Sequence, residues 1–95
     1  MAKQKVVSSN VEEIRKLLGS KGLIIGTELT LKNLKIGKIL KVFVSSNCAE
    51  AVRKDIDYYA GLSSAKVIVL EEPNDELGVI CKKPFSISVL SVLKG

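Results

Sequence analysis

Apolar residues recur along this chain at helical and strand spacings in turn. Val11, Ile14 and Leu18 lie three and four residues apart, which predicts a first amphipathic helix. Ser9 or Asn10 is expected to cap the start of this helix, and Gly19 is expected to end it. A second helix is predicted from about Thr27 to Lys38, with an inner face formed by Leu31 and Leu34 together with Thr27 and the stem of Lys38.

The remaining elements follow the same alternation. A third helix carries Val52, Ile56, Tyr59 and Ser63 on one face, and a short fourth helix is predicted over residues 74–81. Short apolar runs predict strands at residues 23–25, 42–44 and 66–70. A fourth strand is predicted where three apolar residues alternate with serines, namely Phe85, Ile87 and Val89 with Ser86 and Ser88 between them.

Alternating helices and strands indicate an α/β fold, in which one small sheet is covered by helices on both faces. The length of 95 residues fits a single domain over residues 1–95. If the first three strands run parallel, the loops after Ile25, Val44 and Leu70 emerge at one edge of the sheet. Each of these loops leads into a helix N-terminus, which makes the edge a natural site for a phosphate or another polar ligand.

Charge and apolar content narrow the class of partner. The formal net charge is +5, which favours a polyanionic partner but equally suits a soluble domain with a basic surface. Four lysines follow one another closely at positions 32, 35, 38 and 41. No apolar run approaches the ~20 residues of a membrane span, so no membrane partner is expected. The first ten residues lack an apolar signal core, so we expect the protein to stay in the compartment where it is made.

The residue types argue against catalysis and metal binding. The chain has no histidine, and Cys48 and Cys81 do not form a CxxC pair, so a zinc site is not expected. Cys48 is predicted to lie at a turn from strand to helix, where a thiol pKa can fall, but no histidine is available as its general base. Neither a GxxxxGK nor a GxGxxG motif occurs. We therefore expect no enzyme activity, no cofactor and no small-molecule substrate.

Three stretches together resemble a known family of proteins. They are SSNCAEAVRKDIDYYAGL from Ser45, NDELGVICKK from Asn74 and PFSISVLSV from Pro84. They are similar to the archaeal and eukaryotic large-subunit ribosomal proteins numbered thirty in the "e" series, within a superfamily of kink-turn RNA-binding ribosomal proteins. The resemblance implies a three-layer α-β-α sandwich with a four-stranded mixed sheet whose last strand runs antiparallel. It also implies that one edge of this sheet grips a kink-turn, a sharply bent RNA duplex with one nucleotide turned out.

The resemblance assigns roles to individual residues at that edge. The Asn47 amide can donate and accept hydrogen bonds to RNA, and Gly26 lets the backbone approach RNA closely. Arg53 and Lys54 suit phosphates. Phe85 with Ile87 offers an apolar platform for an unstacked base, although Phe85 is equally compatible with a core strand position. The expected RNA-binding set is completed by Thr27, Glu28, Lys32, Asn74 and Ser88.

Two positions depart from the family pattern. Glu28 stands where the family places Lys or Asn; an anion should repel phosphate, although it can accept a hydrogen bond from a base amino group. The next residue is Leu29, which shares an outward-facing stripe with Ile36, seven residues later. This pair is a candidate contact for a neighbouring protein or for an apolar RNA surface.

The function implied is a structural constituent of the large ribosomal subunit that binds ribosomal RNA, in the cytoplasm, beside other ribosomal proteins. Two alternatives stay open. One is a protein–protein adaptor of the same fold with weakened RNA binding, and the other is a kink-turn protein of a non-ribosomal RNA–protein particle. The lysines of the second helix favour RNA, whereas Glu28 and Leu29 favour the adaptor.

Overall fold

The fold was derived from a computed structural model, which describes residues 9–18 and 22–94. Helices and strands alternate along the chain, as the apolar spacing predicts. The elements in order are α1 (Ser9–Leu17), β1 (Leu23–Ile25), α2 (Thr27–Lys35), β2 (Ile39–Val44), α3 (Glu50–Ser63), β3 (Lys66–Val69), α4 (Asn74–Ile80) and β4 (Val89–Leu93).

The four strands form one mixed sheet in the order β1-β4-β2-β3. β4 is antiparallel to both of its neighbours, pairing Ile24 with Ser91 on β1 and Val42 with Ser91 on β2. β2 and β3 are parallel, with Phe43 opposite Ile68. The first three strands therefore point in one direction and the last strand points in the other, which confirms the mixed sheet that the family resemblance implies.

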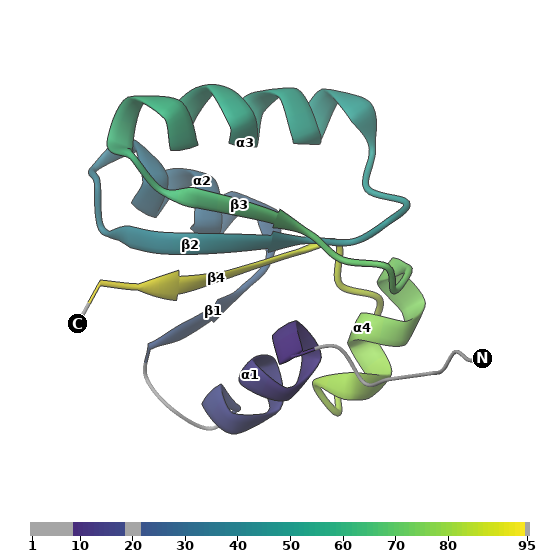
Figure 1. Cartoon of the computed structure of the whole chain (residues 1–95). Coiled ribbons are helices and arrows are strands. Elements are labelled where there is room, and N and C mark those ends of the chain that lie inside the picture. Colours follow the sequence, from purple (N-terminus) through teal and green to yellow (C-terminus); the bar gives the residue numbers. More distant parts are fainter. Residues whose placement is uncertain (1–8, 19–21, 95) are drawn as a thin grey trace.

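Helices cover both faces of the sheet, and this confirms the three-layer sandwich. In Figure 1, α2 and α3 lie above the sheet, and α1 and α4 lie below it. Because neighbouring residues of a strand face opposite sides, Val42 and Val44 pack in the core with Leu34 and Ile56, whereas Phe43 packs with Ile14 and Leu77 in the other core. Each helical layer thus has its own apolar core against one face of the sheet.

The structure corrects the boundaries of three elements. One of them is β2, which begins at Ile39 and not at the predicted residue 42. α2 ends at Lys35 rather than near Lys38, and the chain turns at Gly37, which has a φ of 73°. β4 begins at Val89, so residues 85–88 form a loop and not the start of a strand. The reason is that the Ile87 N–H donates to the carbonyl of Asn74 (3.0 Å), which ties this segment to the start of α4.

The ends of α1 are described only in part. Ser9 and Asn10, predicted as caps, both lie within the helix, while Gly19, predicted to end it, lies outside the described residues. The predicted inward face is confirmed, because Val11 and Ile14 are both buried. Within the described ranges, no helix has the length and apolar character needed to cross a membrane.

A buried pair of hydroxyl groups fixes α2 to the centre of the sheet. Thr30 and Ser91 are both fully buried, and their hydroxyl oxygens are 2.9 Å apart in a hydrogen bond. A buried polar group without a partner is costly, so this pair satisfies both side chains at once. Leu34 of α2 is buried as predicted, but Thr30 also faces the sheet. The bond holds α2, and with it the loop at Gly26, in a fixed position over β4.

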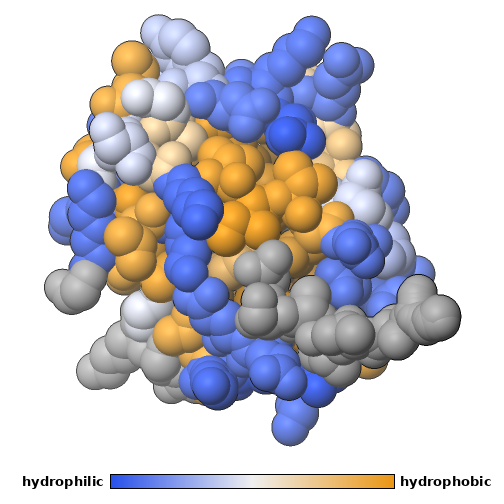
Figure 2. Space-filling view, viewed as in Figure 1, coloured by the Kyte–Doolittle hydropathy of each residue, from blue (hydrophilic) through white to orange (hydrophobic). Residues whose placement is uncertain are grey.

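The sheet has an open edge along β3, the last strand in its order. Figure 2 shows the protein in the same orientation as Figure 1. Apolar side chains are exposed at the centre of the surface in this view, with polar groups around them. Val69 of β3 is among the exposed large apolar residues.

Candidate nucleic-acid interface

Four segments that are distant in sequence meet at the end of the sheet to which β1, β2 and β3 point, on the right in Figure 1. Backbone hydrogen bonds join them: Gly26 N–H to Val89 O (3.0 Å), Ser45 N–H to Ser88 O (2.8 Å) and Ser46 N–H to Glu72 O (2.9 Å). We call the surface formed by Gly26 and residues 45–49, 71–74 and 84–88 the loop edge. The structure therefore brings together the three loops that the strand pattern predicts at one edge, together with the segment before β4, which the family resemblance places there.

Gly26 stands at the point where β1 turns into α2. Its φ of 119° and ψ of 152° lie in a region of backbone conformation that is essentially restricted to glycine. A Cβ added at this position meets no other atom within 4 Å, so glycine is required by the backbone angles and not by crowding. The Gly26 backbone consequently faces open space, where a bulky partner can approach it closely.

Asn47 and Asn74 join two loops of this edge through a reciprocal pair of hydrogen bonds. The Oδ1 of Asn47 accepts from the Asn74 backbone N–H (2.9 Å), and its Nδ2 donates to the Oδ1 of Asn74 (3.2 Å). Asn74 is the first residue of α4, so Asn47 satisfies one of the free N–H groups at the start of that helix. The Nδ2 of Asn74 reaches the hydroxyl of Ser88 at 3.5 Å, which extends the contact to the third loop.

This pairing adds a structural role to a residue that sequence predicts only as an RNA contact. Asn47 is exposed, and each of its amide atoms uses one of its hydrogen-bonding positions on Asn74. An amide carries two donor hydrogens and two acceptor lone pairs, so Asn47 keeps one donor and one acceptor position free for a ligand. The contact with Asn74 fixes the orientation of the amide toward solvent.

The predicted aromatic platform is reduced to one residue. The Phe85 side chain is 55% exposed, so it lies on the loop edge and not in the core. Ile87 is only 3% exposed and packs in the core between the sheet and the layer of α1 and α4. Little of its apolar surface is therefore accessible to a base. Phe85 is therefore the aromatic surface at this edge, and Ile87 supports the loop from below.

Cationic side chains lie beside the loop edge at the start of α3, and a further lysine, Lys32, lies in the last turn of α2, at the end of that helix away from Gly26. Arg53, in the first turns of α3, is half-buried and forms an ion pair with Asp57 one turn later, with 3.5 Å between Nε and Oδ2. Lys54 on α3 and Lys32 on α2 are exposed. Thr27 and Glu28 open α2, where the Glu28 carboxylate interacts favourably with the positive end of the helix dipole.

Gly78 is a residue of this region whose role sequence analysis missed. It lies inside α4, and a Cβ added there comes within 2.2 Å of the Phe85 carbonyl oxygen. The backbone that carries Phe85 therefore crosses α4 at a distance that only glycine permits. A glycine inside an apolar helical pattern is the signal that indicates such a close approach.

Neither cysteine has the environment of a reactive thiol. Burial raises the pKa of the Cys48 thiol, and the nearby Arg53 charge offsets this only in part. Burial also raises the pKa of Cys81, with a smaller opposing effect from Lys83. Both cysteines are free thiols. Among residues 9–18 and 22–94, no group of three or more His, Cys, Asp or Glu side chains is placed to hold a metal ion.

Apolar and aromatic side chains also face outward on α2 and α3, and Leu29 among them is in the first turn of α2, three residues after Gly26 of the loop edge. Leu29 and Ile36 are both more than half exposed, which agrees with the predicted outer stripe, although Ile36 follows the last residue of α2. Tyr59 is partly buried and packs in the core under α3, as predicted, whereas Tyr58 is exposed. The Lys35 ammonium lies 5.1 Å from the centre of the Tyr59 ring.

Comparison with known proteins places this architecture in a family. Residues 9–95 match the model of the family described as "Ribosomal protein L7Ae/L30e/S12e/Gadd45 family". The chain is 42% identical over 81 residues to the large ribosomal subunit protein eL30 of Methanococcus maripaludis, with 85% of this chain and 81% of that protein covered. It is 37% identical to the eL30 of Sulfolobus acidocaldarius, with 85% of this chain and 78% of that protein covered.

Solved structures share the fold at low sequence identity. The Giardia lamblia 15.5kD RNA binding protein superposes with a TM-score of 0.79 at 14% identity, covering 100% of this chain and 79% of that one. A Bacillus halodurans protein of unknown function also gives 0.79, at 20% identity, covering 90% and 84%. The family match over nearly the whole chain and the identity to curated relatives agree: the chain belongs to the L7Ae/L30e/S12e/Gadd45 family of ribosomal proteins.

Proposed function

We propose that this protein is a structural constituent of the large ribosomal subunit in the cytoplasm and that it binds ribosomal RNA at a kink-turn through the loop edge. The observation that carries the proposal is the convergence of an open glycine backbone, an oriented amide and an exposed aromatic ring on one surface, at Gly26, Asn47 and Phe85. The relatives, which are named as large ribosomal subunit proteins, support the ribosomal part of it.

Each part of the loop edge suits a different part of a bent RNA. At Gly26 a sugar-phosphate backbone can approach without a side chain in the way. The free donor and acceptor positions of Asn47 match a base edge. The exposed ring of Phe85 can stack on the nucleotide that a kink-turn turns out of its helix, which contributes about 1–3 kcal/mol per stacked base. Arg53, Lys54 and Lys32 then neutralise phosphates at the flanks.

Glu28 fits this arrangement as a base contact and not as a phosphate contact. It is exposed on the first turn of α2, two residues after the open backbone of Gly26. A carboxylate accepts hydrogen bonds only, so it is suited to the amino group of a guanine or cytosine.

Co-sedimentation tests the proposed function. The tagged protein should travel with large ribosomal subunits on a sucrose gradient at ~150 mM salt, because specific RNA contacts survive that screening. Recovery only in the free protein fractions would contradict a ribosomal role. Recovery with a smaller RNA–protein particle would favour the non-ribosomal alternative.

The exposure of Leu29 and Ile36 favours an additional contact with a neighbouring protein. Replacing them with Ser and Gln should leave the isolated fold nearly as stable, because both side chains are more than half in solvent. If the pair contacts a partner, the double variant should co-sediment less with large subunits while binding isolated RNA as tightly as the wild type. Unchanged co-sedimentation would show that Leu29 and Ile36 contact no partner in the subunit.

A further inference from the structure

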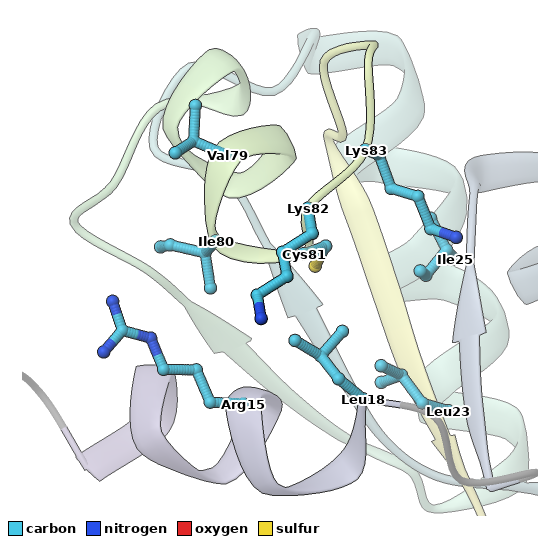
Figure 3. Close-up of a pocket in the computed structure, with 9 residues that line it drawn as sticks. All are labelled: Arg15, Leu18, Leu23, Ile25, Val79, Ile80, Cys81, Lys82 and Lys83. Atoms are coloured by element: carbon cyan, nitrogen blue, oxygen red, sulfur yellow. The ribbon is translucent and has the colours of Figure 1, made fainter.

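A large open pocket lies on the opposite side of the sheet from α2 and α3. It has a volume of about 860 Å³, opens to solvent and is bordered by α1, β1 and the end of α4 (Figure 3). Its floor is apolar, formed by Leu18, Leu23, Ile25 and Ile80. Pockets of this size and apolar character are typical of ligand sites when a few polar groups converge on them.

The charged side chains around this pocket are all positive among the residues that the structure describes. The side chains of Arg15, Lys82 and Lys83 line it, and none of the described residues that line it is acidic. Figure 3 shows the Lys82 ammonium pointing into the space between α4 and α1, with the Arg15 guanidinium on the α1 side and Lys83 extending beside Ile25. Positive groups around an apolar floor complement an anionic ligand that also has an apolar or aromatic part.

The conformation of Lys82 gives a second observation. The residue follows α4 with a φ of 59°, and its N–H donates to Val79 O (3.0 Å) while the Lys83 N–H donates to Gly78 O (2.9 Å). This is the helix-ending arrangement in which glycine is strongly preferred, because a side chain is strained at positive φ. A lysine at this position sacrifices stability and places a positive charge at the mouth of the pocket.

The pocket and the loop edge are formed by adjacent residues of the chain at two points. Ile25 of the pocket directly precedes Gly26, and Lys83 directly precedes the Pro84–Phe85 segment. At the rim, Val79 is 75% exposed and adds apolar surface to the mouth of the pocket. An RNA strand on the loop edge can therefore pass onto the pocket without leaving the protein surface.

We propose that this pocket is a second RNA subsite, in which phosphates of a single strand contact Arg15, Lys82 and Lys83 while one unpaired base rests on the apolar floor. The choice of RNA as the ligand rests on the proposed function. The subsite itself rests on the cationic rim, the strained lysine and the adjacency of pocket and loop-edge residues along the chain. It extends recognition from the bent duplex to the unpaired strand that leaves it.

The test uses the full chain with Lys82→Gly, and Lys66→Gln as the matched control. Lys66 is an exposed lysine on β3, at the edge of the sheet opposite β1. Lys82→Gly should raise the melting temperature by about 4–8 °C, because it relieves the strain at positive φ. The same change should weaken binding to a kink-turn with a single-stranded extension by roughly 3–10-fold and reduce the salt slope by about 0.7–0.9, as expected for one lost phosphate contact. Lys66→Gln should change neither quantity.

Two further readouts separate this proposal from the proposed function. Binding to the same kink-turn without its extension should be affected much less by Lys82→Gly, and the methyl NMR signals of Leu18, Leu23 and Ile80 should shift only with the extended RNA. Equal losses for both RNAs, or methyl signals that the extension leaves unmoved, would overturn the subsite and leave the loop edge intact. If the wild type shows no preference for a kink-turn but Lys82→Gly still weakens binding of the single strand, the proposed function fails and the subsite stands.

Discussion

Replacing Gly78 with alanine is expected to destabilise the protein by about 2–3 kcal/mol, the cost of forcing extra volume into a packed contact. The new methyl group would lie 2.2 Å from the Phe85 carbonyl oxygen, so the backbone of the loop must move away from α4. Because this loop carries Phe85, RNA affinity should fall together with stability. Urea unfolding followed by circular dichroism measures the first effect, and RNA titration of the folded variant measures the second.

Gly61→Ala is the matched control for this prediction. Gly61 also lies inside a helix, α3, but a Cβ added there meets nothing within 4 Å. Alanine favours a helix over glycine, so this variant should be more stable by about 0.5–1 kcal/mol. If Gly78→Ala behaved like Gly61→Ala, the close crossing of the loop over α4 would be contradicted.

Asn47→Ala is expected to lower both stability and RNA affinity. Loss of the hydrogen bond to the first N–H of α4 should cost about 1–2 kcal/mol of folding free energy, as for other helix caps. Loss of the base contact should cost a further ~1–3 kcal/mol of binding free energy. Thermal unfolding and RNA titration of the same preparation separate the two quantities.

Asn47→Asp distinguishes the structural role from the binding role. Aspartate keeps the oxygen that accepts from the Asn74 N–H, and an anion is favourable at a helix N-terminus, so most of the stability should be retained. It removes the amide donor and adds a negative charge facing RNA, so binding should still be weakened. An Asn47→Asp variant that binds RNA like the wild type would exclude the amide as a donor to RNA.

The elements of this fold are largely predictable from sequence, because the regular spacing of apolar residues indicates which side chains are buried. Residues 23–25 are recovered as a strand with the same bounds, and Val52, Ile56 and Tyr59 do face the core. The apolar spacing does not predict that β4 lies between β1 and β2, because strand pairing depends on contacts between distant segments. Its antiparallel direction was expected from the family resemblance and not from the spacing of apolar residues.

The candidate site was predictable in outline but not in its supporting contacts. The place of the site follows from the strand pattern, since loops after parallel strands meet at one edge, whereas the roles of Gly26 and Asn47 come from the family resemblance. The bonds between Asn47 and Asn74 join residues 27 positions apart, and the bond between Thr30 and Ser91 joins residues 61 apart. No local pattern in the sequence reports such pairs. Ile87 is a second example. Its alternation with serines continues into β4, but this pattern does not distinguish a loop residue that is buried from one that is exposed.

Competition between two RNAs of equal length tests the central claim most directly. One RNA carries a kink-turn and the other is a straight duplex, and both compete for the protein at ~150 mM salt, where general attraction to phosphate is screened. Binding through the loop edge predicts at least about a tenfold preference for the kink-turn, equivalent to ~1.4 kcal/mol. Equal affinity for the two RNAs would contradict recognition of a bent RNA by Gly26, Asn47 and Phe85.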